Sequence, residues 1–292
     1  MAYFFTEDHC RIYYEVHGKG EQTIVFINGG SCSYRYWYRQ MSLADKYRLV
    51  FADLRGHGNS EAVPWGYSNE RFAEDVRDLV HYLDLRNVWL CGWSCGASYA
   101  LEYFRLHGDD DGRIKGIIYD DMSVKPSISE DGENLACWGT MSDKGAVAYL
   151  NSLLDTGAGG ALRFGEDPEK SPMPAFFKYD DKCGEYKRLM NTVSPANPAA
   201  VCLLNVSWLA LDHRAVLPTV NIPFLLIEGG AHIVYQKASY DYVAEHVPGC
   251  KRVVFEGAGH ALHMEFAEEF NRTVDAFIEG RELPASEPCI RE

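Results

Sequence analysis

The chain has 292 residues, of which 47% are hydrophobic and 24% are charged, a composition typical of a globular protein with an extensive apolar core. Its formal net charge of −14 argues against a nucleic-acid or anionic-membrane partner, because phosphate groups are bound by clustered Lys and Arg. No stretch reaches the roughly 18 apolar residues of a membrane span, and the first residues lack the features of a secretory signal. We therefore expect a cytoplasmic protein without a membrane partner.

The nine cysteines are scattered, and no two of them have the close spacing of a metal-binding or redox motif. An odd number in a chain of this length does not indicate a disulfide framework. We expect free thiols in a reducing compartment, and we expect neither a metal ion nor another cofactor. The sequence leaves the oligomeric state open.

Short apolar runs alternate with longer segments of helical periodicity along much of the chain. In the first half, strands are predicted at residues 11–16, 23–27, 48–52, 88–91 and 116–119, and helices at residues 70–83 and 97–107. In the last third, strands are predicted at residues 223–228 and 252–255, and helices at residues 237–246 and 264–279. Such alternation is typical of βαβ units and of a mostly parallel sheet.

The alternation stops between residues 124 and 213, where helical periodicity recurs only at 145–154 and 199–211. We interpret this segment as a helical cap inserted into an α/β core that comprises residues 1–123 and 214–292. The cap is rich in large apolar side chains, which favours a small-molecule acyl substrate of apolar or aromatic character. These side chains are Trp138, Tyr149, Leu153, Leu154, Phe164, Met173, Phe176, Phe177, Tyr179, Met190 and Trp208.

A Gly-Trp-Ser-Cys-Gly sequence at residues 92–96 lies between a predicted strand and a predicted helix. Glycines on both sides of the serine favour a sharp turn that exposes the serine hydroxyl. A serine hydroxyl needs a base, an acid that orients the base, and donors for the developing oxyanion. We therefore predict that Ser94 is a nucleophile and that its partners lie at the ends of other strands.

Two further segments supply candidates for these partners. His260 ends the glycine-rich segment that follows the last predicted strand, so we predict that it is the base; for His263 we expect a packing or capping role. Gly30 follows the strand at 23–27 in a second glycine turn. We predict that the backbone N–H groups of Gly30 and Cys95 form the oxyanion hole.

These motifs, in this order, resemble those of the α/β-hydrolase family. The family also carries an Asp-x-Arg-Gly-x-Gly-x-Ser sequence, found here at residues 53–60. In the family this sequence mostly forms a structural turn, so we do not expect His57 to take part in catalysis. The resemblance covers nearly the whole chain. It implies the α/β-hydrolase fold, with a mostly parallel eight-stranded sheet flanked by helices and a helical cap.

Two positions depart from the family pattern. Asn28 replaces the usual His in the glycine turn, which leaves the backbone donors in place. His232 stands where the family most often has its acid, and an imidazole cannot stabilise the imidazolium that forms on the base. Some relatives carry the acid after the preceding strand, where this chain has Asp120 and Asp121. The alignment favours Asp121.

Asp120 and Glu228 remain alternative acids. The leading functional hypothesis is a serine hydrolase, similar to a carboxylesterase, that cleaves a small ester or related acyl bond through an acyl-enzyme. One alternative is a catalytically weakened receptor or scaffold of the same fold, which His232 favours. Others are a C–C bond hydrolase, an aminopeptidase or a perhydrolase, which would use the same triad.

Overall fold

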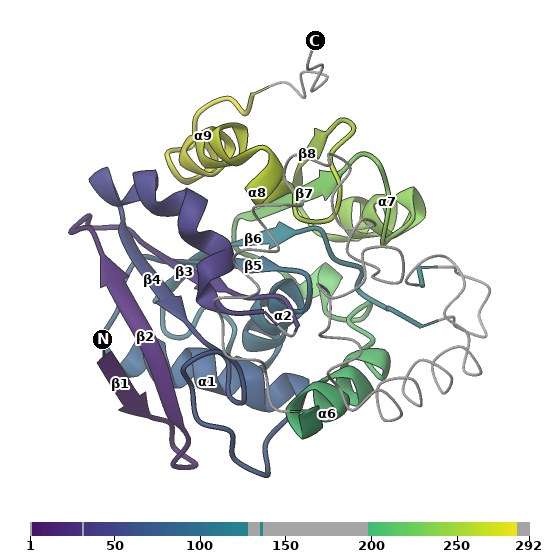
Figure 1. Ribbon diagram of the computed structural model, residues 1–292. Helices are drawn as coiled ribbons and strands as arrows, with labels where there is room; N and C mark the ends of the chain where they lie inside the picture. Colours follow the sequence, from purple (N-terminus) through teal and green to yellow (C-terminus); the bar gives the residue numbers. More distant parts are fainter. Residues whose placement is uncertain (1, 31, 128–134, 137–197, 285–292) are drawn as a thin grey trace.

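The computed structural model describes residues 2–30, 32–127, 135–136 and 198–284 (Figure 1). Within these residues, eight strands form one sheet in the order β1-β2-β4-β3-β5-β6-β7-β8. The strands are β1 (Ala2–Phe5), β2 (Arg11–His17), β3 (Thr23–Ile27), β4 (Arg48–Ala52), β5 (Val88–Trp93), β6 (Ile114–Asp120), β7 (Phe224–Gly229) and β8 (Lys251–Phe255). β1 and β2 pair antiparallel, as do β2 and β4, and all other neighbours are parallel.

Helices cover both faces of the sheet (Figure 1). The α-helices are α1 (Asn69–Tyr82), α2 (Cys95–His107), α6 (Pro198–Leu209), α7 (Lys237–His246), α8 (Leu262–Glu265) and α9 (Ala267–Ile278), and the 3₁₀ helices are η1 (Tyr34–Asp45) and η3 (Leu217–Thr219). The core on one face joins α1, α2, α6 and α7 to the sheet. The core on the other face joins η1, α8 and α9 to it.

The central strands are buried along their whole length, as their continuous apolar sequences predict. Successive side chains of a strand point to opposite faces, so Val25 and Ile27 pack in one core, and Ile24 and Phe26 in the other. The predicted α/β-hydrolase fold with a mostly parallel eight-stranded sheet is confirmed.

The C-terminal part of the core differs from the prediction in one respect. A single helix at residues 264–279 was expected, but α8 and α9 are separate helices. The chain leaves helical geometry at Phe266, which has φ −122° and ψ 48°. The Phe266 ring is buried in the core, so packing of this side chain accompanies the break.

The predicted cap at 124–213 lies largely outside the described residues, so its limits remain a prediction. Its described helix α6 docks on the start of α1, where Asn69 donates to Ser207 from its backbone N–H at 2.8 Å and from its side-chain amide at 2.8 Å. Along the described parts of the chain, no helix combines the length and the apolar character needed to cross a membrane.

The turn at residues 53–60 contains a fully buried arginine. Arg55 makes two hydrogen bonds to Asp75, at 2.6 and 2.7 Å, and two to Asp8, at 2.8 and 2.9 Å. Nearby, Asp53 accepts hydrogen bonds from the backbone N–H groups of Tyr34 and Asn59. The turn therefore links the segment after β1 to α1 and η1.

We expect Asp75→Ala to lower the free energy of unfolding by roughly 3 kcal/mol, because it leaves the buried Arg55 guanidinium short of a counter-ion. Urea denaturation measures this effect. Lys237→Ala is the control, since its exposed ammonium pairs with Asp241 on the surface; it should change the stability by less than about 1 kcal/mol. Equal effects of the two substitutions would contradict the assigned role of Arg55.

A second buried ion pair connects α2 to the segment that follows α6. Glu102 accepts hydrogen bonds from Arg105, at 2.6 and 2.8 Å, and lies 2.7 Å from Nε2 of the buried His213. Burial by itself would raise the pKa of Glu102, but the hydrogen bonds of Arg105 and His213 outweigh it and lower this pKa from 4.5 to about 2. The folded state therefore binds a proton at Glu102 less readily than the unfolded state does.

Glu102 should accordingly stabilise the fold above pH 4.5, and this contribution should be lost as the pH falls from 4.5 toward 2. Glu102→Gln should be less stable than the wild type at pH 7, and the difference should shrink at pH 3. Urea unfolding at pH 7, 5 and 3 measures the difference. A difference that is the same at all three pH values would contradict this assignment.

Candidate active site

Ser94 lies at a strained turn between β5 and α2. Its backbone has φ 54° and ψ −128°, a conformation that side-chain-bearing residues rarely adopt. The Ser94 N–H donates to the backbone carbonyl of Asp120 at 2.9 Å, which fixes the turn to the end of β6. This is the geometry of a nucleophile elbow, as the sequence motif predicts.

The two glycines of the motif are required by close backbone approaches. A Cβ on Gly92 would lie 2.3 Å from the carbonyl oxygen of Gly96, and a Cβ on Gly96 would lie 2.2 Å from that of Ile27. Both distances are far below van der Waals contact. The elbow can therefore press α2 against β5 and β3 only because neither position carries a side chain.

His260 follows β8 and is buried, with 4% of its side chain exposed. Its Nδ1 lies 2.5 Å from Oδ2 of Asp121, the residue that follows β6. Trp93, which precedes Ser94, donates from its indole Nε1 to the backbone carbonyl of His260 at 2.8 Å. The carboxyl ends of the parallel strands β5, β6 and β8 thus bring Ser94, Asp121 and His260 to one edge of the sheet.

The Asp121 carboxylate has two more hydrogen-bond donors. Oδ1 accepts from the backbone N–H of Gly229 at 2.8 Å and from the hydroxyl of Tyr240 at 2.8 Å. Asp121 itself adopts a left-handed backbone conformation, with φ 50°. Several donors around one carboxylate stabilise a negative charge there, so the group is suited to orient an imidazole and to stabilise its cationic form.

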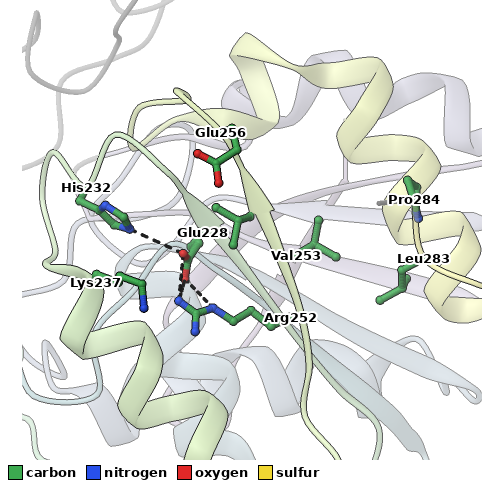
Figure 2. Close-up of a pocket in the computed structure, with 9 residues that line it drawn as sticks. Glu228, His232, Lys237, Arg252, Val253, Glu256, Leu283 and Pro284 are labelled. Atoms are coloured by element: carbon green, nitrogen blue, oxygen red, sulfur yellow. Dashed lines mark hydrogen bonds and ion pairs between the residues drawn. The ribbon is translucent and has the colours of Figure 1, made fainter. Parts of the chain in front are cut away.

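The two alternative acids contact other residues. Oδ2 of Asp120 lies 3.1 Å from Nδ1 of His263. Glu228 accepts two hydrogen bonds from Arg252, each at 3.0 Å, and its carboxylate lies 3.6 Å from His232. Dashed lines in Figure 2 mark these contacts. Of the three candidate acids, the structure places Asp121 beside His260.

A cavity of about 550 Å³ opens beside Glu228. It is lined by Glu228, His232, Lys237, Arg252, Val253, Val254, Glu256, Leu283 and Pro284 (Figure 2). Ser94, Asp121 and His260 are not among these residues. The cavity therefore belongs to the edge of the sheet around β8 and is separate from the Ser94 site.

The predicted oxyanion-hole residues lie next to each other. A Cβ on Gly30 would lie 3.1 Å from Sγ of Cys95 and 3.1 Å from Cδ2 of Leu204 in α6. Asn28 is fully buried and donates from its side chain to the carbonyl of Ala52 at 2.7 Å, which anchors the glycine turn to β4. Burial raises the pKa of the Cys95 thiol to about 11, so this sulfur is a poor second nucleophile at neutral pH.

Sequence reasoning missed two residues that hold the candidate triad. Trp93 appears in the motif only as the residue before the serine, and Tyr240 lies more than 100 residues from Asp121 in the chain. Buried Trp and Tyr usually find a hydrogen-bond partner, but the sequence does not identify that partner. Of the apolar cap side chains expected near the substrate, all but Trp208 lie outside the described residues, and Trp208 is buried.

Residues 24–273 match the sequence profile of the alpha/beta hydrolase family, and the chain therefore belongs to this family. A non-heme chloroperoxidase from Kitasatospora aureofaciens is 27% identical over 290 residues, which cover 94% of this chain and 98% of that protein. A serine hydrolase from Mus musculus is 26% identical over 280 residues, with coverage of 92% and 83%. A bifunctional esterase/perhydrolase from Acinetobacter calcoaceticus is 24% identical over 285 residues, with coverage of 95% and 99%.

Solved structures share the fold. A bromoperoxidase from Bacillus anthracis superimposes with a TM-score of 0.80 at 24% identity, covering 95% of this chain and 100% of that one. An esterase from Exiguobacterium antarcticum gives a TM-score of 0.78 at 23% identity, with coverage of 95% and 99%. At this level of sequence identity the structural similarity establishes the fold but not the reaction.

Proposed function

We propose that the protein is a serine hydrolase that cleaves a small ester or related acyl bond through an acyl-enzyme. The observation that carries this proposal is the 2.5 Å contact between Asp121 and His260 at the sheet edge where the strained turn presents Ser94. A nucleophile, a base and an orienting acid at the ends of three strands of one sheet are the parts that acyl transfer requires.

In the proposed mechanism, Oγ of Ser94 attacks the substrate carbonyl carbon while His260 accepts the hydroxyl proton. The carbonyl oxygen becomes an oxyanion, which the N–H groups of Gly30 and Cys95 stabilise. The bond to the leaving group breaks, and His260 returns the proton to the departing oxygen. Water then attacks the carbonyl carbon of the acyl-enzyme while His260 accepts a proton from the water. The bond to Oγ of Ser94 breaks, and His260 returns the proton to Oγ. These steps release the carboxylic acid and regenerate Ser94.

The first test is labelling with a fluorophosphonate, which reacts with an activated serine hydroxyl. We expect stoichiometric labelling of the wild type at neutral pH, mapped by mass spectrometry to the peptide that contains Ser94. Ser94→Ala should not be labelled, and Cys95→Ala, which changes the neighbouring nucleophile, should be labelled like the wild type. A folded wild-type protein that resists the probe would favour the receptor or scaffold hypothesis instead.

Perhydrolysis is the second candidate function, because relatives along nearly the whole chain are named chloroperoxidase or esterase/perhydrolase. In this reaction hydrogen peroxide replaces water as the acceptor of the acyl group, and a peracid leaves in place of the acid. A panel of p-nitrophenyl esters of increasing acyl length, with and without hydrogen peroxide, separates the two functions. Peracid formation that depends on Ser94 would add perhydrolysis to ester hydrolysis.

A further inference from the structure

The residue before the nucleophile, Trp93, ends β5 and lies on the sheet face that η1, α8 and α9 cover. Only 3% of its surface is exposed. Its ring stacks on that of Tyr36 in η1, with centroids 5.6 Å apart, and meets the ring of His263 in α8 edge-on at 4.8 Å. Tyr36 and His263 are completely buried. In an interior packed this closely, the indole cannot shift without displacing its neighbours.

One edge of the indole holds the loop that carries the base. The pyrrole N–H of Trp93 donates to the backbone carbonyl of His260 at 2.8 Å, and this hydrogen bond is buried. The two rings also lie close together, with centroids 5.3 Å apart. Because the hydrogen bond acts on the main chain, it fixes the point from which the imidazole extends. The imidazole then reaches Asp121 through the 2.5 Å contact at Nδ1.

The other edge of the indole touches the glycine turn that carries the predicted oxyanion hole. A Cβ on Gly29 would lie 2.9 Å from Cε3 and 3.0 Å from Cζ3 of Trp93, two atoms of the six-membered ring. It would also lie 3.2 Å from Cβ of Ser94. A hydrogen bond of 3.2 Å from the N–H of Cys32 to the carbonyl of Gly29 closes the turn. The next residue is Gly30, whose N–H is assigned to the hole.

Gly29 is not required by its backbone conformation. Its φ lies outside the left-handed region, so an alanine could adopt the same backbone. A side chain at position 29 is excluded mainly by the space that Trp93 occupies, and to a smaller extent by Cβ of Ser94. Positions 29 and 93 are therefore sterically coupled, because the large ring at one requires the absence of a side chain at the other.

We propose that Trp93 is a positioning residue, whose rigid indole holds the base loop and the oxyanion turn at a fixed separation. The proposal rests on the proposed function, because this separation matters to chemistry only if His260 and the N–H of Gly30 act on one substrate. When Ser94 attacks, its proton has to reach the imidazole while the carbonyl oxygen reaches the hole. A fused aromatic ring does not bend, so the contacts at its two edges set both positions together.

The first test replaces Trp93 with phenylalanine, which keeps an aromatic ring but has neither the N–H nor the full width of the indole. We expect Trp93→Phe to lower kcat for a p-nitrophenyl ester by about 10- to 100-fold, with KM within about threefold of the wild type, because misplaced groups slow chemistry more than binding. The rate of fluorophosphonate labelling at Ser94 should fall with kcat. A kcat within about threefold of the wild type would overturn the proposal.

Trp89→Phe is the matched control for this substitution. Trp89 lies near the other end of β5, in the same core, and is 6% exposed. Its N–H donates to the side chain of Gln22 at 2.7 Å, and its ring excludes a Cβ at Gly116. Trp89→Phe should therefore disturb packing to a similar extent and leave kcat within about threefold of the wild type. An equal loss of kcat in both variants would identify a general effect of strand packing and overturn the proposal.

A second replacement of Trp93 isolates the hydrogen bond, and it also serves if Trp93→Phe does not fold. 3-Benzothienylalanine has a fused ring of nearly the same shape, with sulfur in place of the N–H. It should lower kcat by about 5- to 50-fold, since the carbonyl of His260 loses the Trp93 donor while the contact with Gly29 remains. An unchanged kcat would show that this hydrogen bond does not position the base, and the proposal would fail.

A double-mutant cycle tests the other edge of the ring. Gly29→Ala places a methyl group against the indole and should lower kcat by about 10- to 100-fold in the wild type. In the Trp93→Phe background the smaller ring leaves room for the methyl group, so Gly29→Ala should lower kcat further by less than about threefold. The contact with Cβ of Ser94 is common to both backgrounds and cancels. Equal effects in the two backgrounds would show that the indole does not set the turn, which would contradict the proposal.

The same cycle measured by urea unfolding does not depend on turnover. Gly29→Ala should lower the unfolding midpoint more in the wild type than in the Trp93→Phe background, because the smaller ring relieves the clash. Coupling in stability without coupling in kcat would identify a purely structural contact and overturn the proposal. If the stability coupling is present and the wild type is neither labelled nor active, the indole does contact the turn and it is the proposed function that has failed.

Discussion

Replacing Ser94 with alanine should lower kcat/KM for p-nitrophenyl acetate by about 10⁴- to 10⁶-fold. The acyl-enzyme cannot form without the hydroxyl, and the remaining rate reflects oxyanion stabilisation and binding alone. The fold should be unaffected, because alanine at this position has the same Cβ as serine and occupies the same turn. Initial rates by absorbance, together with thermal unfolding, measure both quantities.

The matched control for this prediction is Cys95→Ala, which removes a neighbouring side chain and leaves the backbone N–H of residue 95 in place. Its kcat/KM should stay within about tenfold of the wild type, since only the N–H is assigned to the oxyanion hole. Turnover by Ser94→Ala at a rate near that of the wild type would show that another group attacks the substrate. It would remove the basis for the proposed mechanism.

The second large effect is expected for Asp121→Asn, which should lower kcat by about 10⁴-fold. An amide facing Nδ1 of His260 would donate to it, so the ring would carry its proton on Nε2 and could not accept the one from Ser94. Gly229 and Tyr240 can still donate to the amide oxygen, which keeps the side chain in place. Steady-state kinetics at pH 7 to 8 measure the loss.

Asp120→Asn is the matched control for this prediction, because it makes the same carboxylate-to-amide change at the adjacent residue. It should cost less than about tenfold, because Asp120 contacts His263 and not His260. If Asp120→Asn abolished activity and Asp121→Asn did not, the acid would have to be reassigned. Tyr240→Phe, which removes one donor to Asp121, should fall between the wild type and Asp121→Asn.

Much of the fold could be predicted because its signals are local. The central strands are continuous apolar runs, and the glycines at 92 and 96 mark a turn where a Cβ would collide with the backbone. The short edge strand β1 has an exposed residue at Phe5 and no strong periodicity, so its sequence gives little indication of a strand. The break at Phe266 depends on core packing, which helical periodicity does not include.

The choice between Asp120 and Asp121 illustrates what a pattern of residues leaves open. Side chains along a strand alternate between faces, so only one of two successive aspartates can reach His260. Which one does so depends on where β6 ends, and strand ends are poorly determined by sequence. The alignment favoured Asp121, and the structure places its Oδ2 at 2.5 Å from Nδ1 of His260. The partner of Asp120 could not be anticipated, because His263 lies on a separate short helix.

Gly229, the last residue of β7, contacts two other parts of the proposed site. In this chain Gly229 carries no charge to the site, and it contributes a backbone N–H that binds Asp121 from the side. A Cβ at Gly229 would lie 2.2 Å from the carbonyl oxygen of Gly259, so the end of β7 also packs directly against the loop that carries His260. The end of β7 thus helps to set the spacing between Asp121 and His260, the proposed acid and base.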